Sequence, residues 1–158
     1  MNNNQKKFCD LFAFKSGSLL FLLGFFCLML SVTRAGESKS YALILNSDSE
    51  REHISFQDVR SIYLGKMTLW EDGSRVQPCM LREKERAMQG FIKSSLGKSV
   101  YQYRAYWKRK LFSGGGTVPK TFRTTKSLLQ YVKRTPGAIG VISAGSQTEG
   151  VKRVEVPQ

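Results

Sequence analysis

The hydrophobic pattern of the chain predicts four strands. Residues 41–46 form a short continuous apolar run, which is typical of a strand covered on both faces. Residues 76–81 are a second strand-like run, and residues 138–142 are expected to form a short buried strand. Residues 151–156 alternate between apolar and polar positions, as in a half-exposed strand. Pro78 interrupts the second run, and because proline cannot donate a hydrogen bond to a neighbouring strand, it predicts an edge strand or a bulge there.

Apolar residues at intervals of three and four predict four helices between these strands. The first begins at Ser55, where Asp58 completes a capping-box-like pair, and it ends at Gly65. The others are expected over 83–96, from Ser99 through Leu111, and from Thr124 or Thr125 to Arg134. The order of these elements predicts one α/β domain with a small mixed sheet and helices packed on it.

The first 35 residues have the pattern of a targeting signal. Three lysines precede the apolar run 19–30, and a small-residue site ends at Ala35. This pattern predicts a secretory signal peptide cleaved after Ala35, and therefore a periplasmic location for the domain 36–158. An uncleaved inner-membrane anchor is the alternative, although a run of 12 residues is short against the roughly 20 that span a bilayer.

Composition narrows the chemistry of the domain 36–158. It carries 21 basic and 11 acidic side chains, a net charge of +10, which attracts anions and anionic surfaces. His53 is the only histidine and Cys79 the only cysteine of this domain, so neither a zinc set of usual type nor an intramolecular disulfide is available. No nucleophile turn lies near His53. We expect no catalysis, no metal and no cofactor.

Three polar segments are candidate ligands for a small anion. They are Asn46 and Ser47 after the first strand, Arg82 and Arg86 where the second strand leads into a helix, and the loop residues Ser113, Gly114, Gly115 and Thr117. Helix N-termini and glycine-rich loops offer backbone N–H groups to anions, and arginine binds oxyanions in a bidentate manner. Each segment is also compatible with a plain role, as a turn, as surface ion pairs or as a mobile loop. As ligands, Ser47, Arg82 and Ser113 should line one cleft.

Residues 101–110 interleave aromatic and basic side chains, a pattern also found in single-strand nucleic-acid sites. Tyr103 and Trp107 share the helical spacing of the inward stripe, which favours core packing, and we expect no nucleic-acid partner. Lys108, Arg109 and Lys110 could instead face an anionic membrane or lipopolysaccharide.

Two longer motifs carry a family resemblance. The stretch 61–70, SIYLGKMTLW, and the stretch 135–141, TPGAIGV, resemble in order and spacing the periplasmic phosphate-binding proteins of ABC importers. The resemblance is closer to short, single-domain phosphate ABC transporter substrate-binding proteins, and it covers about 41–141.

The resemblance implies a periplasmic-binding-protein-like lobe and an exported, monomeric solute-binding protein for a small anion. Phosphate or a phosphorylated compound is the implied ligand, and an ABC permease is an implied partner. Arg82 matches the arginine of the family's phosphate cradle, but the sequence continues Lys84-Glu85-Arg86 and lacks the Ser-Gly-Thr of that cradle. The alternative is a non-catalytic envelope protein that binds an anionic surface or a partner protein through its basic face.

Overall fold

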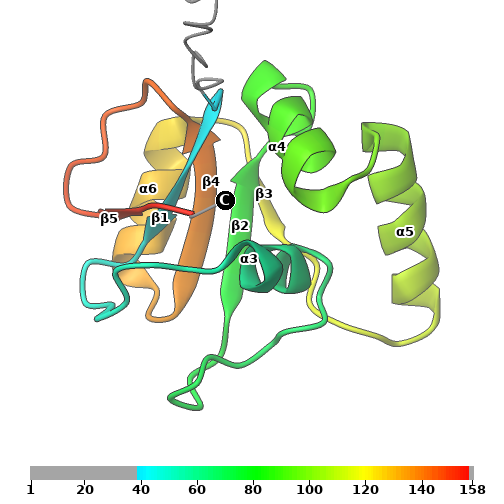
Figure 1. The fold of residues 1–158 in the computed structure, drawn as a ribbon, viewed down its shortest axis with the longest axis horizontal. Helices are drawn as coiled ribbons and strands as arrows, with labels where there is room; N and C mark the ends of the chain where they lie inside the picture. Colours follow the sequence, from blue (N-terminus) through cyan, green and yellow to red (C-terminus); the bar gives the residue numbers. More distant parts are fainter. Residues whose placement is uncertain (1–38, 157–158) are drawn as a thin grey trace, which may run out of the picture. The chain divides into compact units, whose positions relative to one another are not determined.

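The protein is described by a computed structural model over residues 39–156, so the predicted leader and its cleavage site lie outside the described residues. Figure 1 shows the described elements. They are β1 (Tyr41–Leu45), α3 (Phe56–Tyr63), β2 (Gln77–Leu81), α4 (Arg86–Leu96), α5 (Val100–Phe112), β3 (Lys120–Phe122), α6 (Thr125–Arg134), β4 (Ala138–Ser143) and β5 (Lys152–Val154).

The five strands form one mixed sheet in the order β3-β2-β4-β1-β5. β2 runs parallel to β3 and β4, whereas β1 runs antiparallel to β4 and β5. Leu45 lies opposite Ile139 near the beginning of β4, and Tyr41 lies opposite Ser143 at its end. The predicted α/β class with a small mixed sheet is confirmed.

β2 is an interior strand, so the expectation of an edge strand at Pro78 is wrong. The backbone N–H of Gln77 points toward β4 and donates to Gly137 O. The nitrogen of the next residue, Pro78, therefore faces the other side, toward β3. β3 pairs only from Cys79 onward, so the missing N–H of Pro78 leaves no acceptor of β3 without its donor.

The two sides of the sheet are covered by different helices. In Figure 1, α6 lies behind the sheet, and α3 lies in front of it. α6 packs on β4, β2 and β3. α4 packs on β4 and β1, and it also contacts both α3 and α5. Gly140 allows α6 to approach closely, because a Cβ there would lie 3.0 Å from side-chain atoms of both Ile44 and Leu128.

The predicted helix starts are mostly confirmed. Ser55, Ser99 and Thr124 accept hydrogen bonds from N–H groups in the first turn of α3, α5 and α6. Two details differ from the prediction. α4 begins at Arg86, because 83–85 form a turn, and Leu111 is 57% exposed rather than inward.

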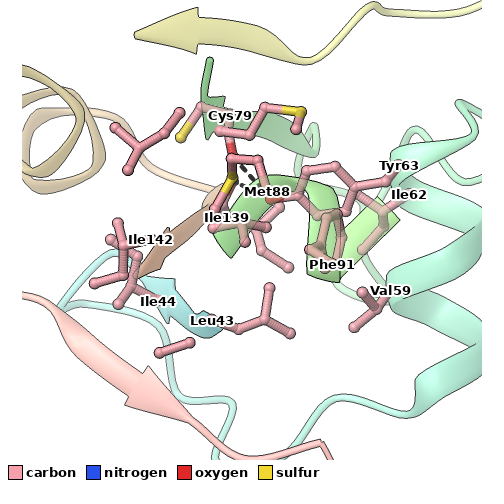
Figure 2. Close-up of a cluster of buried hydrophobic side chains, with 14 of the residues drawn as sticks. Leu43, Ile44, Val59, Ile62, Tyr63, Cys79, Met88, Phe91, Ile139 and Ile142 are labelled. Atoms are coloured by element: carbon pink, nitrogen blue, oxygen red, sulfur yellow. Dashed lines mark hydrogen bonds between the residues drawn. The ribbon is translucent and has the colours of Figure 1, made fainter. Parts of the chain in front are cut away.

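The main core lies between β1, β2 and β4 and the helices α3 and α4, as Figure 2 shows. Phe91 of α4 meets Tyr63 of α3 edge-on, with ring centroids 4.9 Å apart. The Tyr63 hydroxyl lies within 2.8 Å of Cys79 O and 3.1 Å of Ile139 O, so it links β2 to β4. Over 39–156, no helix is both long and apolar enough to cross a bilayer.

Candidate functional site

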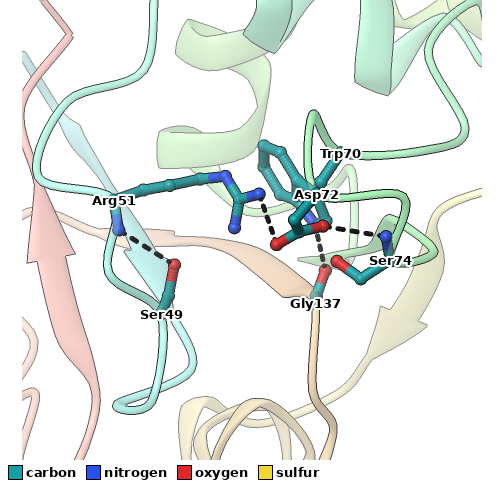
Figure 3. Close-up of polar contacts among 6 residues, drawn as sticks. All are labelled: Ser49, Arg51, Trp70, Asp72, Ser74 and Gly137. Carbon is teal, nitrogen blue, oxygen red and sulfur yellow. Dashed lines mark hydrogen bonds and ion pairs between the residues drawn. The ribbon is translucent and has the colours of Figure 1, made fainter.

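A hollow of about 600 Å³ lies at the end of the sheet where β1 ends and β4 begins. Three loops form its walls: the segment after β1, the turn that follows Trp70, and the turn before β4. Figure 3 shows the polar contacts between these loops.

The two motifs that carry the family resemblance meet at this hollow. The indole Nε1 of Trp70 donates a hydrogen bond of 3.0 Å to the carbonyl oxygen of Gly137. Gly137 has φ +72°, and a Cβ there would lie 2.4 Å from Arg75 O. The tryptophan is buried, so in this structure the contact between Trp70 and Gly137 holds two loops together.

Arg51 and Asp72 close one side of the hollow. Their ion pair has an N–O distance of 2.8 Å, and the Arg51 guanidinium lies 4.4 Å from the ring centroid of Trp70. Hydrogen bonds from Ser74, and then the one from Arg51, lower the pKa of the Asp72 carboxyl to about 2. Asp72 is therefore ionised at any physiological pH.

The charges that line the hollow do not favour an anion. Its walls contain four carboxylates and a single guanidinium, and that guanidinium is already paired with Asp72. The carboxylates belong to Asp48, Glu50, Glu71 and Asp72. An oxyanion entering here would meet like charges, so this hollow is a poor phosphate site despite the basic net charge of the protein.

Asn46 lines this hollow, but its side chain is used within the fold. Its Nδ2 donates to Val132 O at 2.8 Å and to Lys133 O at 3.0 Å, near the C-terminal end of α6. Its Oδ1 accepts from the backbone N–H of Asp48. Asn46 is 3% exposed, and its amide supplies a donor to carbonyl groups at the helix end, where the intrahelical N–H partners run out. Ser47 is exposed and does not line the hollow.

Arg82 and Arg86 lie at the opposite end of the strands, where β2 leads into α4. Among the described helices, α4 alone has no side-chain hydrogen bond at its N-cap, Glu85. Glu83, two residues before Glu85 in the sequence, is paired with Arg104. Orphan N–H groups at such a helix start favour an anion.

β3 adds a third arginine to this end of the sheet. The N–H of Arg82 donates to Phe122 O at 3.1 Å, so Arg82 and Arg123 follow neighbouring parallel strands. The sequence prediction missed β3, and with it Arg123. The only signal was the three-residue run at 120–122, which is too short for a periodicity to show.

The glycine loop lies elsewhere again, beside the ends of α3 and α5. The Lys110 ammonium donates to Leu64 O and Gly65 O at 2.7 Å each, and Gly115 and Gly116 lie over the Lys110 side chain. Lys110 therefore satisfies the C-terminal carbonyls of α3 rather than facing a ligand. The hydroxyl of Ser113 donates to Lys110 O. Gly114 and Thr117 are exposed.

The structure does not bring the three predicted segments into one cleft. Ser47 follows the end of β1 and Arg82 follows the end of β2, and these two ends lie at opposite ends of β4. Ser113 follows α5, where its hydroxyl contacts Lys110 O, and it does not line the hollow. Within 39–156, no three His, Cys, Asp or Glu side chains gather in a way that could hold a metal ion. His53 is exposed and forms only a backbone bridge to Glu155.

Known structures share this fold at low sequence identity. An ABC-type phosphate transport receptor from Vibrio cholerae is 15% identical, with a TM-score of 0.56 over 74% of this chain and 46% of the receptor. A phosphate-bound putative phosphate ABC transporter substrate-binding protein from Clostridium perfringens is 16% identical, with a TM-score of 0.57 over 74% and 44%. PstS from Borrelia burgdorferi is 12% identical, with a TM-score of 0.55 over 74% and 47%.

No family model and no curated protein sequence matches the chain. The chain spans less than half the length of the three receptors. At these identities the likeness concerns the fold alone. The mixed α/β fold of this protein is therefore similar to one part of phosphate-binding ABC receptors.

Proposed function

We propose that this protein is an exported, non-catalytic solute-binding-like protein for a small anion, phosphate or a phosphorylated compound. One observation carries the proposal. On a fold similar to phosphate receptors, the uncapped N-terminus of α4 lies between Arg82 and Arg86, with Arg123 on the next strand. An ABC permease or another envelope protein would be its macromolecular partner, and a periplasmic location follows from the predicted leader.

The arrangement suits an oxyanion on physical grounds. Ligands of α/β sheets bind beyond the carboxyl ends of parallel strands, and Arg82 and Arg123 both follow such ends. Among the described residues, neither guanidinium forms an ion pair with a carboxylate, and neither does that of Arg86. The N–H groups of the first turn of α4 would supply neutral donors, and the arginines would supply charge.

Isothermal titration of the fragment 36–158 with phosphate, sulfate and phosphorylated metabolites tests this proposal. The fragment is suitable for this test because it contains a separate compact unit with its own hydrophobic core. We expect binding of at least one anion of this panel, and loss of that binding in the double variant Arg82→Ala/Arg123→Ala. The matched control is Arg75→Ala/Arg134→Ala, which removes the same charge from exposed positions elsewhere. A folded fragment that binds none of these anions, or equal loss in both double variants, would contradict the proposal.

A further inference from the structure

α5 has aromatic residues on two opposite sides. Tyr103 and Trp107 are buried against the rest of the fold. Tyr101 is 80% exposed and Phe112 is 84% exposed, the two highest values among the large apolar side chains described as exposed. The packing of α5 accounts for the first pair and leaves the second pair without a structural role.

The exposed residues follow one stripe along the helix. Tyr101, Ala105, Lys108 and Phe112 are spaced by four, three and four residues, which places them on one side of an α-helix. We call this stripe, together with Arg109 beside it, the outer α5 face. Tyr101 and Phe112 mark its two ends, about 16 Å apart at 1.5 Å per residue. In Figure 1, α5 lies at the margin of the described domain.

The charge of the outer α5 face has a single sign. α5 contains no acidic residue. Lys108 and Arg109 are exposed, and within 39–156 neither is in an ion pair. Lys110, which the sequence placed in the same basic cluster, points instead at the carbonyl groups of Leu64 and Gly65. The free cations on this face are therefore Lys108 and Arg109.

We propose that the outer α5 face docks on the surface of an anionic phospholipid bilayer, independently of the anion site at α4. Lys108 and Arg109 would meet lipid phosphates, while Phe112 and Tyr101 would enter the headgroup region, where amphipathic aromatic rings are favoured. The face lies along a single exposed helix and combines exposed apolar rings with cations of one sign. That combination matches a helix that lies at the surface of an anionic bilayer.

Flotation with vesicles tests the proposal on the fragment 36–158, which omits the apolar run 19–30 because that run would bind bilayers by itself. The vesicles contain phosphatidylcholine alone or phosphatidylcholine with 30% phosphatidylglycerol, roughly an anionic envelope surface. We expect binding only to the anionic vesicles, weakened by added salt. The variant Lys108→Glu/Arg109→Glu should bind about tenfold or more weakly.

A matched pair of controls separates the outer α5 face from diffuse positive charge. Lys126→Glu/Arg134→Glu changes the net charge equally on α6, and it should retain most of the binding. Equal loss in both double variants, or no preference for anionic vesicles, would overturn the proposal. A lack of vesicle binding combined with capture by an envelope protein would also overturn it, in favour of a protein partner.

Insertion is tested separately from electrostatic contact. An environment-sensitive fluorophore on Phe112→Cys should show a blue shift on anionic vesicles, whereas the same probe on Leu69→Cys should not. Leu69 is 53% exposed and lies in a loop away from α5. The native Cys79 is fully buried, so only the introduced thiol reacts. An unshifted probe at position 112 on bound protein would show that the aromatic end stays in water and would overturn the docking geometry.

Discussion

At the scale of single residues, the Tyr63 hydroxyl is a buried polar group that links two strands of the core. It is fully buried and hydrogen-bonds to carbonyl oxygens on two strands, Cys79 O and Ile139 O. We expect Tyr63→Phe to lower the free energy of unfolding by about 1–2 kcal/mol, because buried acceptors lose their donor. Urea denaturation at pH 7 measures this difference.

The control for that prediction is another tyrosine. Tyr101→Phe removes the same hydroxyl from a side chain that is 80% exposed, and it should change stability by less than about 0.5 kcal/mol. Equal effects of the two substitutions would show that the Tyr63 hydroxyl contributes nothing specific to the link between β2 and β4.

Cys79 makes stability depend on pH in the alkaline range. Burial raises the pKa of its thiol well above the ordinary value of about 8.5. Because the folded pKa exceeds the unfolded one, the stabilisation is complete below about pH 8.5 and declines as pH rises above it, where the unfolded chain loses the proton first. Urea midpoints between pH 7.5 and 9.5 should fall more for the wild type than for Cys79→Ala, and parallel curves would contradict this assignment.

At the scale of elements, the sequence predicted those features that depend on local chemistry. Capping residues such as Ser55 and Ser99 satisfy N–H groups two or three positions away, so the helix starts could be read directly. β3 could not, because a run of Lys, Thr and Phe becomes a strand only through its pairing with β2. The prediction at Pro78 was wrong for the same reason. β2 can contain a proline because its pairing with β3 begins only at Cys79, and the sequence does not show where that pairing begins.

The turn before β4 is the element whose geometry allows the sharpest test. Gly137 has φ +72°, and any Cβ there would collide with Arg75 O. We expect Gly137→Ala to lower the free energy of unfolding by about 2–4 kcal/mol, since backbone strain adds to the displacement of the loop that Trp70 binds. Thermal or urea unfolding measures this loss.

Gly73 provides the matched comparison for that turn. It has φ +79°, but a Cβ there would meet no atom within 4 Å. Gly73→Ala should therefore lower the free energy of unfolding only by the cost of placing a Cβ at positive φ, about 1 kcal/mol. If both variants lost the same stability, the contact with Arg75 O would be irrelevant.

At the scale of the whole molecule, the site could not be predicted from the sequence because its geometry depends on the directions of the strands. The expected convergence of Ser47 and Arg82 assumed that both follow carboxyl ends at the same end of the sheet. β1 runs antiparallel to β4, however, while β2 runs parallel to it. Direction depends on pairing between distant segments, which a single sequence does not encode locally, so each candidate loop could be found but not their arrangement.

The size of the described unit leads to a last prediction, about ligand response. The part of this chain that matches the receptors covers less than half of their length, and two-lobed binding proteins close by hinge motion around their ligands. A monomeric fragment 36–158 should have a radius of gyration of about 14 Å, against roughly 18 Å for a dimer.

An anion that binds only the native state should raise the melting temperature of the fragment through mass action. Because the described elements form one sheet with one core, X-ray scattering should show the same radius with and without that anion. A shrinkage on binding would mean that the unit contains a hinge after all, and a value near the dimer size would contradict the monomer.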